Sequence, residues 1–169
     1  MKYEDAGIKT GDLLLVDGEG LVSEIIEVVT GGHLSHVGVF FWEDGELKIS
    51  EFWEPNGYQD NLAAVRLPQI VGKMYLGTAP DVIHDTPENV LEEVMVYRDN
   101  KNLDAYGFET LAKVAACDDL GVKISPALVQ PVCSVFAQKV WMKCGVEFNT
   151  LLSPSDMGCY CKTVIALEL

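Results

Sequence analysis

The sequence predicts an α+β fold in which a small, barrel-like antiparallel sheet packs on helices. Two observations predict it: strand-forming segments joined by a tight turn gather in the first half of the chain, and helical patterns of apolar residues dominate the second half. With 169 residues, the chain is long enough for one domain with its own core. We therefore expect residues 1–169 to form a single domain.

The first half of the chain is expected to supply the sheet. The dipeptide Asp44-Gly45 lies between two runs rich in β-branched and aromatic residues, which is typical of a type I′ hairpin. Pro68 ends a third strand-like run. The elements expected in this half are a turn and buried strand at 11–16, a short helix at 21–32, and strands at 35–43, 46–53 and 63–68.

The second half of the chain is expected to supply the helices. Asp85, Pro87 and Glu88 have the spacing of a helix start, and Gly145 suits the position just after a helix end. The elements expected in this half are helices at 85–99, 104–119 and 132–145, a polar turn at 153–158 and, at 160–167, either a strand or a short helix.

The charge balance argues against several classes of partner. The net charge of −14, from 26 acidic and 12 basic residues, repels phosphate backbones and anionic lipids, so we expect no nucleic-acid partner. No apolar run is long enough to span a membrane. The N-terminal segment MKYEDAGIKTGD lacks the apolar region of a secretory signal. We therefore expect a cytoplasmic protein, or one exported by a non-classical route.

The five cysteines predict neither a disulfide framework nor a zinc site. Their number is odd, and the C-x-C pair Cys159 and Cys161 has no second pair at zinc-binding spacing. No metal or other cofactor is therefore expected. Cys117 and Cys144 fall near the C-terminal ends of predicted helices and are interpreted as core residues. Cys133 differs from them because it falls at the start of a predicted helix.

The predicted hairpin brings a histidine and a glutamate together. With a two-residue turn, Gly38 lies opposite Glu51, and His36 shares the face of Gly38 because side chains alternate along a strand. His36 and Glu51 are then diagonal neighbours with Cβ atoms about 6–8 Å apart. A carboxylate on one ring nitrogen fixes the histidine tautomer and leaves the other nitrogen free to act as a base. Gly38 is expected to leave room for the helix that carries the nucleophile.

Cys133 is the candidate nucleophile for this base. The backbone N–H groups and the dipole at a helix N-terminus favour the thiolate form of a cysteine. Each residue also has a structural interpretation, as a core cysteine, a structural histidine and a solvated glutamate. The joint occurrence of Cys133, His36 and Glu51 favours a catalytic site over these separate interpretations.

The order of five motifs resembles a known superfamily. The motifs are GDLLLV at 11–16, LSHVGVFF at 34–41, ISEFWE at 49–54, VCSVFAQKVW at 132–141 and SPSDM at 153–157. Together they resemble the permuted NlpC-type papain-like cysteine hydrolases, in particular the YiiX-like branch. The resemblance implies a permuted papain-like fold with Cys133 as nucleophile, His36 as base and Glu51 as the residue that orients the base. The segment DAYGF at 104–108 is similar to the tyrosine-containing segment of that group.

The sequence also departs from the superfamily at two positions. Members commonly carry an aromatic residue just before the cysteine and an acidic residue two positions after it, where this chain has Val132 and Val135. These departures concern the lining of the substrate pocket. They leave the three predicted catalytic residues in place.

The resemblance implies an amidase or peptidase that cleaves an acyl or amide bond through an acyl-enzyme. Bacterial cell-wall peptides are the leading substrate class, so the expected partner is a peptide or an acyl small molecule. The alternatives are a lipid acyl hydrolase or acyltransferase, and a non-catalytic binding module on the same scaffold. The oligomeric state is left open.

The other histidines and the tryptophans are given no catalytic role. His33 is interpreted as a polar loop residue and His84 as a surface residue. Trp42, Trp53 and Trp141 are interpreted as core or cleft-wall residues.

Overall fold

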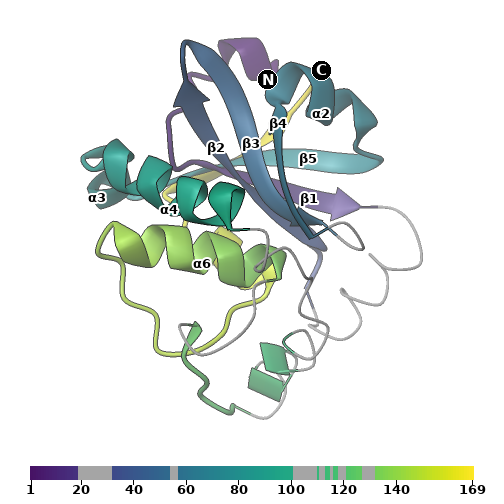
Figure 1. The fold of residues 1–169 in the computed structure, drawn as a ribbon. Coiled ribbons are helices and arrows are strands. Elements are labelled where there is room, and N and C mark those ends of the chain that lie inside the picture. Colours follow the sequence, from purple (N-terminus) through teal and green to yellow (C-terminus); the bar gives the residue numbers. More distant parts are fainter. Residues whose placement is uncertain are drawn as a thin grey trace.

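The computed structural model describes residues 1–18, 32–53, 57–100, 110, 113–114, 116–117, 121–126 and 132–169. Within these residues, six strands form one antiparallel sheet in the order β4-β3-β2-β1-β5-β6 (Figure 1). The strands are β1 (Leu13–Gly18), β2 (His36–Glu43), β3 (Glu46–Trp53), β4 (Gly57–Leu62), β5 (Gly72–Thr78) and β6 (Thr163–Leu167). Together with the helices, this sheet confirms the predicted α+β class.

The β2–β3 hairpin has the predicted register. Glu43 pairs with Glu46, and Gly38 pairs with Glu51. Asp44 and Gly45 have φ angles of 53° and 80°, and a type I′ turn requires positive φ at both of its central residues. The turn chemistry therefore sets which side chains of the two strands share a face.

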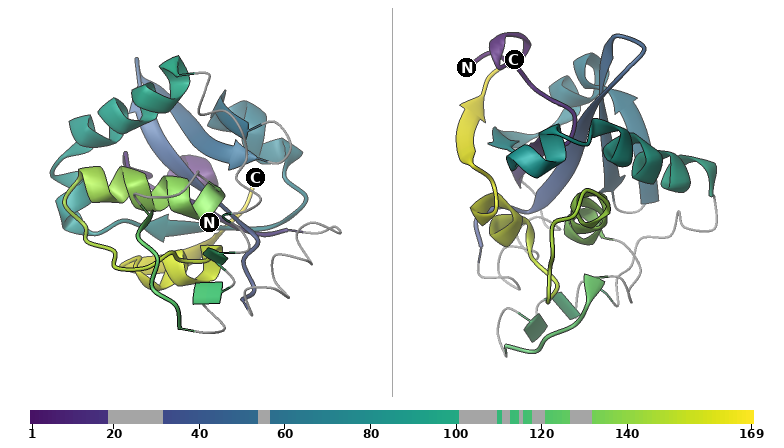
Figure 2. Two further views of the ribbon diagram at one scale, coloured as in Figure 1. Left: turned by 60° about the horizontal axis from the view of Figure 1, so that its bottom comes forward. Right: turned by 90° about the vertical axis from the view of Figure 1, so that its left-hand side faces the viewer.

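Helices cover both faces of the sheet. The described helical elements are η1 (Tyr3–Asp5), α2 (Ala63–Arg66), η2 (Leu67–Gln69), α3 (Asp81–His84), α4 (Pro87–Asp99), α6 (Cys133–Lys143) and α7 (Pro154–Cys159). Helices α4 and α6 lie side by side on one face, with α7 next to α6 (Figures 1 and 2). None of the helices within the described residues combines the length and apolar character that a bilayer crossing needs.

Alternation along β2 and β3 divides the apolar residues between two cores. The larger core joins Val37, Val39 and Phe52 of these strands to Phe136 and Trp141 of α6. The second core contains the side chains that alternate with them, together with α2 and η2. Its buried members include Leu14, Phe40, Ile49, Ala63 and Leu67. His36, Gly38 and Glu51 alternate onto this second face, which α2 covers.

Two predicted elements of the first half of the chain are corrected. The strand expected at 63–68 is wrong, because Ala63–Arg66 is helix α2 and Leu67–Gln69 is a 3-10 turn. Two consecutive alanines favour a helix here. The third strand of the meander is instead β4. Its sequence GYQDNL is largely polar and lacks the alternation of apolar residues that would have predicted a strand. Strand β5 had no counterpart among the predicted elements.

The second half largely follows the prediction. Helix α4 has Pro87 at its first position, and α6 lies within the predicted range. The turn expected at 153–158 is wrong: it is helix α7, whose first turn is closed by a capping box between Ser153 and Asp156. The segment 160–167 contains strand β6.

Two predicted helices fall wholly or mainly outside the described residues. Of the helix expected at 21–32, only Gly32 is described, and it lies in a bend. Of the helix expected at 104–119, the described residues 110, 113–114 and 116–117 are helical.

The two chain ends meet at one end of the sheet (Figures 1 and 2). The N-terminal amine donates to the Ala166 carbonyl at 3.1 Å, and Tyr3 and Glu168 are joined by a backbone hydrogen bond of 3.1 Å. The first residues of the chain thus extend the hydrogen bonding of β6.

Candidate functional site

His36 and Glu51 are in direct contact, as the hairpin register predicts. His36 Nε2 lies 2.6 Å from Glu51 Oε2. The two side chains are 8% and 0% exposed, so this is a buried pair. A carboxylate that takes up Nε2 fixes the orientation of the ring and leaves Nδ1 for another partner.

Cys133 supplies that further partner from the start of α6. It is the first residue of the helix, after an extended Val132, and it is 3% exposed. Its thiol lies close enough to the His36 ring to raise the pKa of the histidine. His36 is the first residue of β2, so the beginning of α6 meets the ring at the end of the strand. The structure therefore brings Cys133, His36 and Glu51 together from three separate elements.

The pKa of His36 reflects both burial and these contacts. Burial disfavours the charged ring and on its own would lower the pKa. The interactions with Cys133 and Glu51 outweigh burial and raise the pKa of His36 from its ordinary 6.5 to about 9. An imidazolium at neutral pH follows from this arrangement.

Glu51 is held in its charged form by its partners. Burial on its own would raise the pKa of this carboxyl, but the contacts with His36 and Arg66 outweigh it and lower the pKa. A buried carboxylate that stays ionised can stabilise the imidazolium beside it.

Arg66 and Trp53 belong to the same cluster, and sequence reasoning missed the role of both. Arg66 Nε donates to Glu51 Oε1, and a second guanidinium nitrogen lies 3.4 Å from Glu51 Oε2. The guanidinium also lies 4.4 Å from the centroid of the Trp53 ring. That ring meets the His36 ring edge-on at 4.5 Å. The signal in the sequence was a single arginine in an apolar segment, which needs a buried partner.

The space beside Gly38 is occupied by side chains of β3 and not by the helix that carries Cys133. A Cβ atom at this position would lie 2.9 Å from Ile49 Cγ2 and 3.5 Å from Glu51 Cβ. Both neighbours belong to β3, so the prediction that Gly38 makes room for the nucleophile helix is wrong. The reason is alternation, because Gly38 faces α2 whereas α6 packs on the other face.

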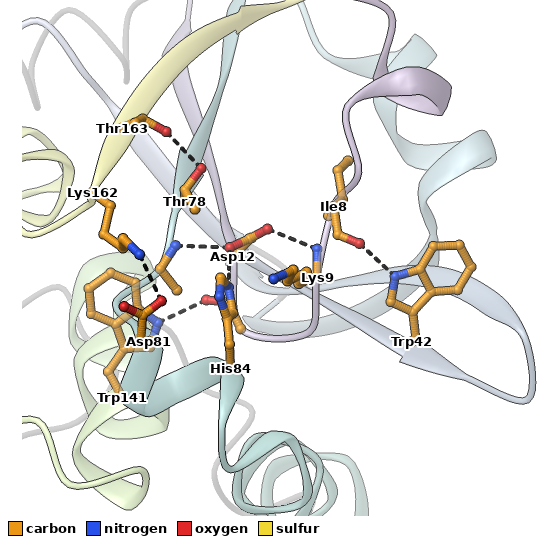
Figure 3. Close-up of polar contacts among 12 residues, drawn as sticks. Ile8, Lys9, Asp12, Trp42, Thr78, Asp81, His84, Trp141, Lys162 and Thr163 are labelled. Carbon is orange, nitrogen blue, oxygen red and sulfur yellow. Dashed lines mark hydrogen bonds and ion pairs between the residues drawn. The ribbon is translucent and has the colours of Figure 1, made fainter.

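His84 is not the surface residue that the sequence suggested. Its side chain is 10% exposed, and Nε2 lies 2.8 Å from Asp12 Oδ1. Asp12 also accepts hydrogen bonds from the backbone N–H groups of Ala79 and Lys9 (Figure 3). These contacts join the start of β1 to α3 and to the end of β5.

The remaining aromatic and polar assignments have mixed outcomes. His33 is an exposed loop residue, as expected. Trp141 is a core residue whose Nε1 donates to the Gly11 carbonyl at 2.9 Å (Figure 3). Trp42 is 45% exposed, so it is not a core residue.

A pocket of about 590 Å³ lies away from the Cys133 cluster. Met142, Phe148 and Tyr160 contribute to its lining, at the C-terminal end of α6. Cys133 is at the other end of that helix. The pocket and the polar cluster are therefore separate features of the molecule.

The fold and the cluster define an α+β protein with a cysteine, a histidine and a glutamate in contact. No protein-family model and no curated protein matches the sequence. A solved structure similar to this chain is that of metalloprotein yiiX (DUF1105) from Escherichia coli O157:H7. The TM-score is 0.52 at 10% sequence identity, over 95% of this chain and 96% of that chain. The chain therefore has a YiiX-like fold.

A metal site needs several donor side chains gathered in one place. Among them, no group of three or more His, Cys, Asp or Glu side chains is placed to hold a metal ion. A protein metal site ordinarily takes three or four such ligands. The donor set in this part of the chain thus does not match a metal centre.

Proposed function

We propose that the protein is a cysteine hydrolase that cleaves acyl or amide bonds through Cys133, His36 and Glu51. The observation that carries the proposal is the interaction of the Cys133 thiol, which raises the pKa of His36, with a histidine that is itself bound to a buried carboxylate. Nucleophile, base and orienting group in this order form the general arrangement of a catalytic triad. A YiiX-like fold agrees with the sequence resemblance that suggested these residues.

In the proposed reaction, the Cys133 proton passes to His36, giving a thiolate and an imidazolium. The thiolate attacks the substrate carbonyl and forms a C–S bond. The bond to the amine or alcohol then breaks as His36 returns the proton to that leaving group. A water molecule, deprotonated by His36, attacks the thioester and releases the acid and the free thiol. The backbone N–H of Cys133, at the helix start, is a candidate donor to the oxyanion.

Amide bonds of cell-wall peptides are the substrate class we propose. The support for this class is the resemblance of the five motifs, which span residues 11–157, to the permuted NlpC-type hydrolases. The acidic surface, with a net charge of −14, favours a neutral or basic substrate over an anionic one. Lipid esters and thioesters are the competing class in the test.

The name of the structural neighbour raises the question of a metal, because yiiX is called a metalloprotein. The described residues of this chain offer no matching set of donors. The proposed reaction therefore uses the side chains of Cys133, His36 and Glu51.

Trapping of the acyl-enzyme tests the proposal. The protein is incubated in parallel with muropeptides and with acyl lipids, and the peptide that contains Cys133 is weighed by mass spectrometry. We expect an acyl adduct on Cys133 with the muropeptides and none in Cys133→Ala, whose turnover should fall by several orders of magnitude. Cys144→Ala is the matched control, because Cys144 ends the same helix and is also buried. Full turnover by Cys133→Ala would overturn the proposal.

A further inference from the structure

We propose that Arg66 is a positioning residue of this site. From α2 it fixes the orientation of the Glu51 carboxylate and supplies the positive charge that lets a buried thiolate, imidazolium and carboxylate coexist. This inference rests on the proposed function, since it assigns Arg66 a task only if Cys133 and His36 form the reactive pair. Nothing in the motifs of the sequence pointed to this arginine.

The geometry ties Arg66 to the site by two routes. The guanidinium contacts both oxygens of Glu51, one of which also binds His36 Nε2. It also lies over the Trp53 ring, which in turn contacts the His36 ring. Arg66 thus restrains the carboxylate directly and the imidazole through an aromatic neighbour. Its own side chain is 8% exposed, so it has less conformational freedom than a surface arginine.

The balance of charges around Glu51 also requires Arg66. Among the described residues, the titratable groups that face Glu51 are His36 from β2, Arg66 from α2 and, beyond His36, Cys133 from α6. The residue opposite Glu51 on β4 is the uncharged Gln59. With Cys133 ionised and His36 protonated, these charges cancel only if Arg66 is included. Without Arg66, a net negative charge remains in a buried site, and such a site takes up a proton more readily.

Removal of Arg66 should therefore make it easier for the site to take up one proton at low pH. Either Glu51 takes the proton and ceases to stabilise the imidazolium, or Cys133 takes it directly. Both routes remove the thiolate. The loss should be marked at acidic pH and small at alkaline pH, where the thiolate forms in any case. A purely structural role of Arg66 would reduce the amount of folded protein without this dependence on pH.

The test is the rate at which iodoacetamide alkylates Cys133, followed by peptide mass spectrometry from pH 5 to pH 9. In Arg66→Met, the acid limb of this profile should move to higher pH by about one unit, so that on the steep part of the limb the rate at a given pH is about tenfold lower. Arg66→Lys keeps the charge and should stay close to the wild-type profile. An Arg66→Lys profile as displaced as that of Arg66→Met would overturn the role of the charge.

Arg98→Met is the matched control. Arg98 also pairs with a glutamate of the sheet, Glu43, and lies 5.8 Å from the centroid of an aromatic ring, Phe41. Glu43 and His36 are at opposite ends of β2, about 20 Å apart along the strand. This variant should be destabilised by loss of its ion pairs and yet keep the wild-type alkylation profile.

Failure of this inference is distinguishable from failure of the proposed function. If wild-type Cys133 is inert at pH 6, the hydrolase proposal itself is contradicted. If wild-type Cys133 reacts at pH 6 and Arg66→Met has the same profile, only the role of Arg66 is overturned. Should Arg66→Met not fold, the decision rests on Arg66→Lys and on Arg66→Gln, which retains hydrogen-bond donors without the charge. An Arg66→Gln profile equal to that of the wild type would likewise refute the role.

Discussion

At the scale of single residues, the protonation of His36 links the site to stability. The pKa of His36 is raised from 6.5 to about 9 in the folded protein. A raised pKa means that the charged ring stabilises the fold fully below about pH 6.5, and that this contribution is lost as the pH rises through about 9.

His36→Gln should therefore change the pH dependence of unfolding. We expect the wild type to lose stability relative to His36→Gln between about pH 6.5 and about pH 9, because only the wild type has this charge to lose. Urea unfolding at several pH values measures the difference. Parallel stability profiles for the two proteins would show that His36 is not protonated in the way the contacts require.

Glu51 carries a second residue-scale prediction. Glu51→Gln removes the charge that Arg66 faces and leaves a buried guanidinium without an ionic partner. We expect a loss of roughly 3–5 kcal/mol in the free energy of unfolding. The double variant Glu51→Gln/Arg66→Met should recover part of that loss, because no unpaired charge is left behind. Additive losses in a double-mutant cycle would contradict the coupling between the two residues.

At the scale of elements, the sequence predicts best those elements whose shape is set by residues close together in the chain. The β2–β3 hairpin was predictable to the residue, because Asp44-Gly45 fixes the turn and alternation fixes the faces. The contact between His36 and Glu51 follows from that register alone. Helix α2 was not predictable in the same way, because four residues with no side-chain cap are held by their packing on the sheet.

The role of Arg66 could not be predicted from the sequence. The predicted strand at 63–68 gave its side chain no partner. Only the fold reveals that α2 covers the face on which Glu51 lies. The contact of Cys133 with His36 is equally non-local, and the sequence pointed to it through a resemblance and a helix start, with no geometric link between them.

Helix α7 offers a test at the scale of one element. Ser153 accepts from the Asp156 N–H, and Asp156 accepts in turn from the Ser153 N–H at 3.1 Å. Ser153→Ala should lower the free energy of unfolding by about 1 kcal/mol, whereas Ser153→Asn keeps a cap and should lose less. Thermal or urea unfolding measures both. Equal stabilities of the wild type and Ser153→Ala would show that the capping box contributes nothing.

At the scale of the whole molecule, α6 connects the site to the core. It begins at Cys133 and, near its other end, is fixed by Trp141, which is fully buried and bonded to the Gly11 carbonyl ahead of β1. The position of Cys133 thus depends on packing along the entire helix. The pair formed by Asp12 and His84, the last residue of α3, lies beside this anchor (Figure 3).

Trp141→Phe tests this connection. The variant keeps an aromatic ring but removes the donor to a buried carbonyl, which should cost about 1–3 kcal/mol of stability. We also expect slower alkylation of Cys133, because the start of α6 is then less firmly placed against His36. Trp42→Phe is the control on an exposed tryptophan and should leave the alkylation of Cys133 unchanged. An unaltered rate of Cys133 alkylation in Trp141→Phe would show that the reactivity of Cys133 does not depend on Trp141.

We propose that interaction with His36 makes Cys133 the most reactive thiol of the chain. The most direct test is the order in which iodoacetamide modifies the five cysteines at pH 6, read by peptide mass spectrometry in the wild type and in His36→Ala. Exposure alone would put Cys159 first, since Cys159 is exposed and Cys133 is buried. We expect Cys133 to react first in the wild type and to lose that lead in His36→Ala. Modification of Cys159 first, with Cys133 protected in both proteins, would contradict it.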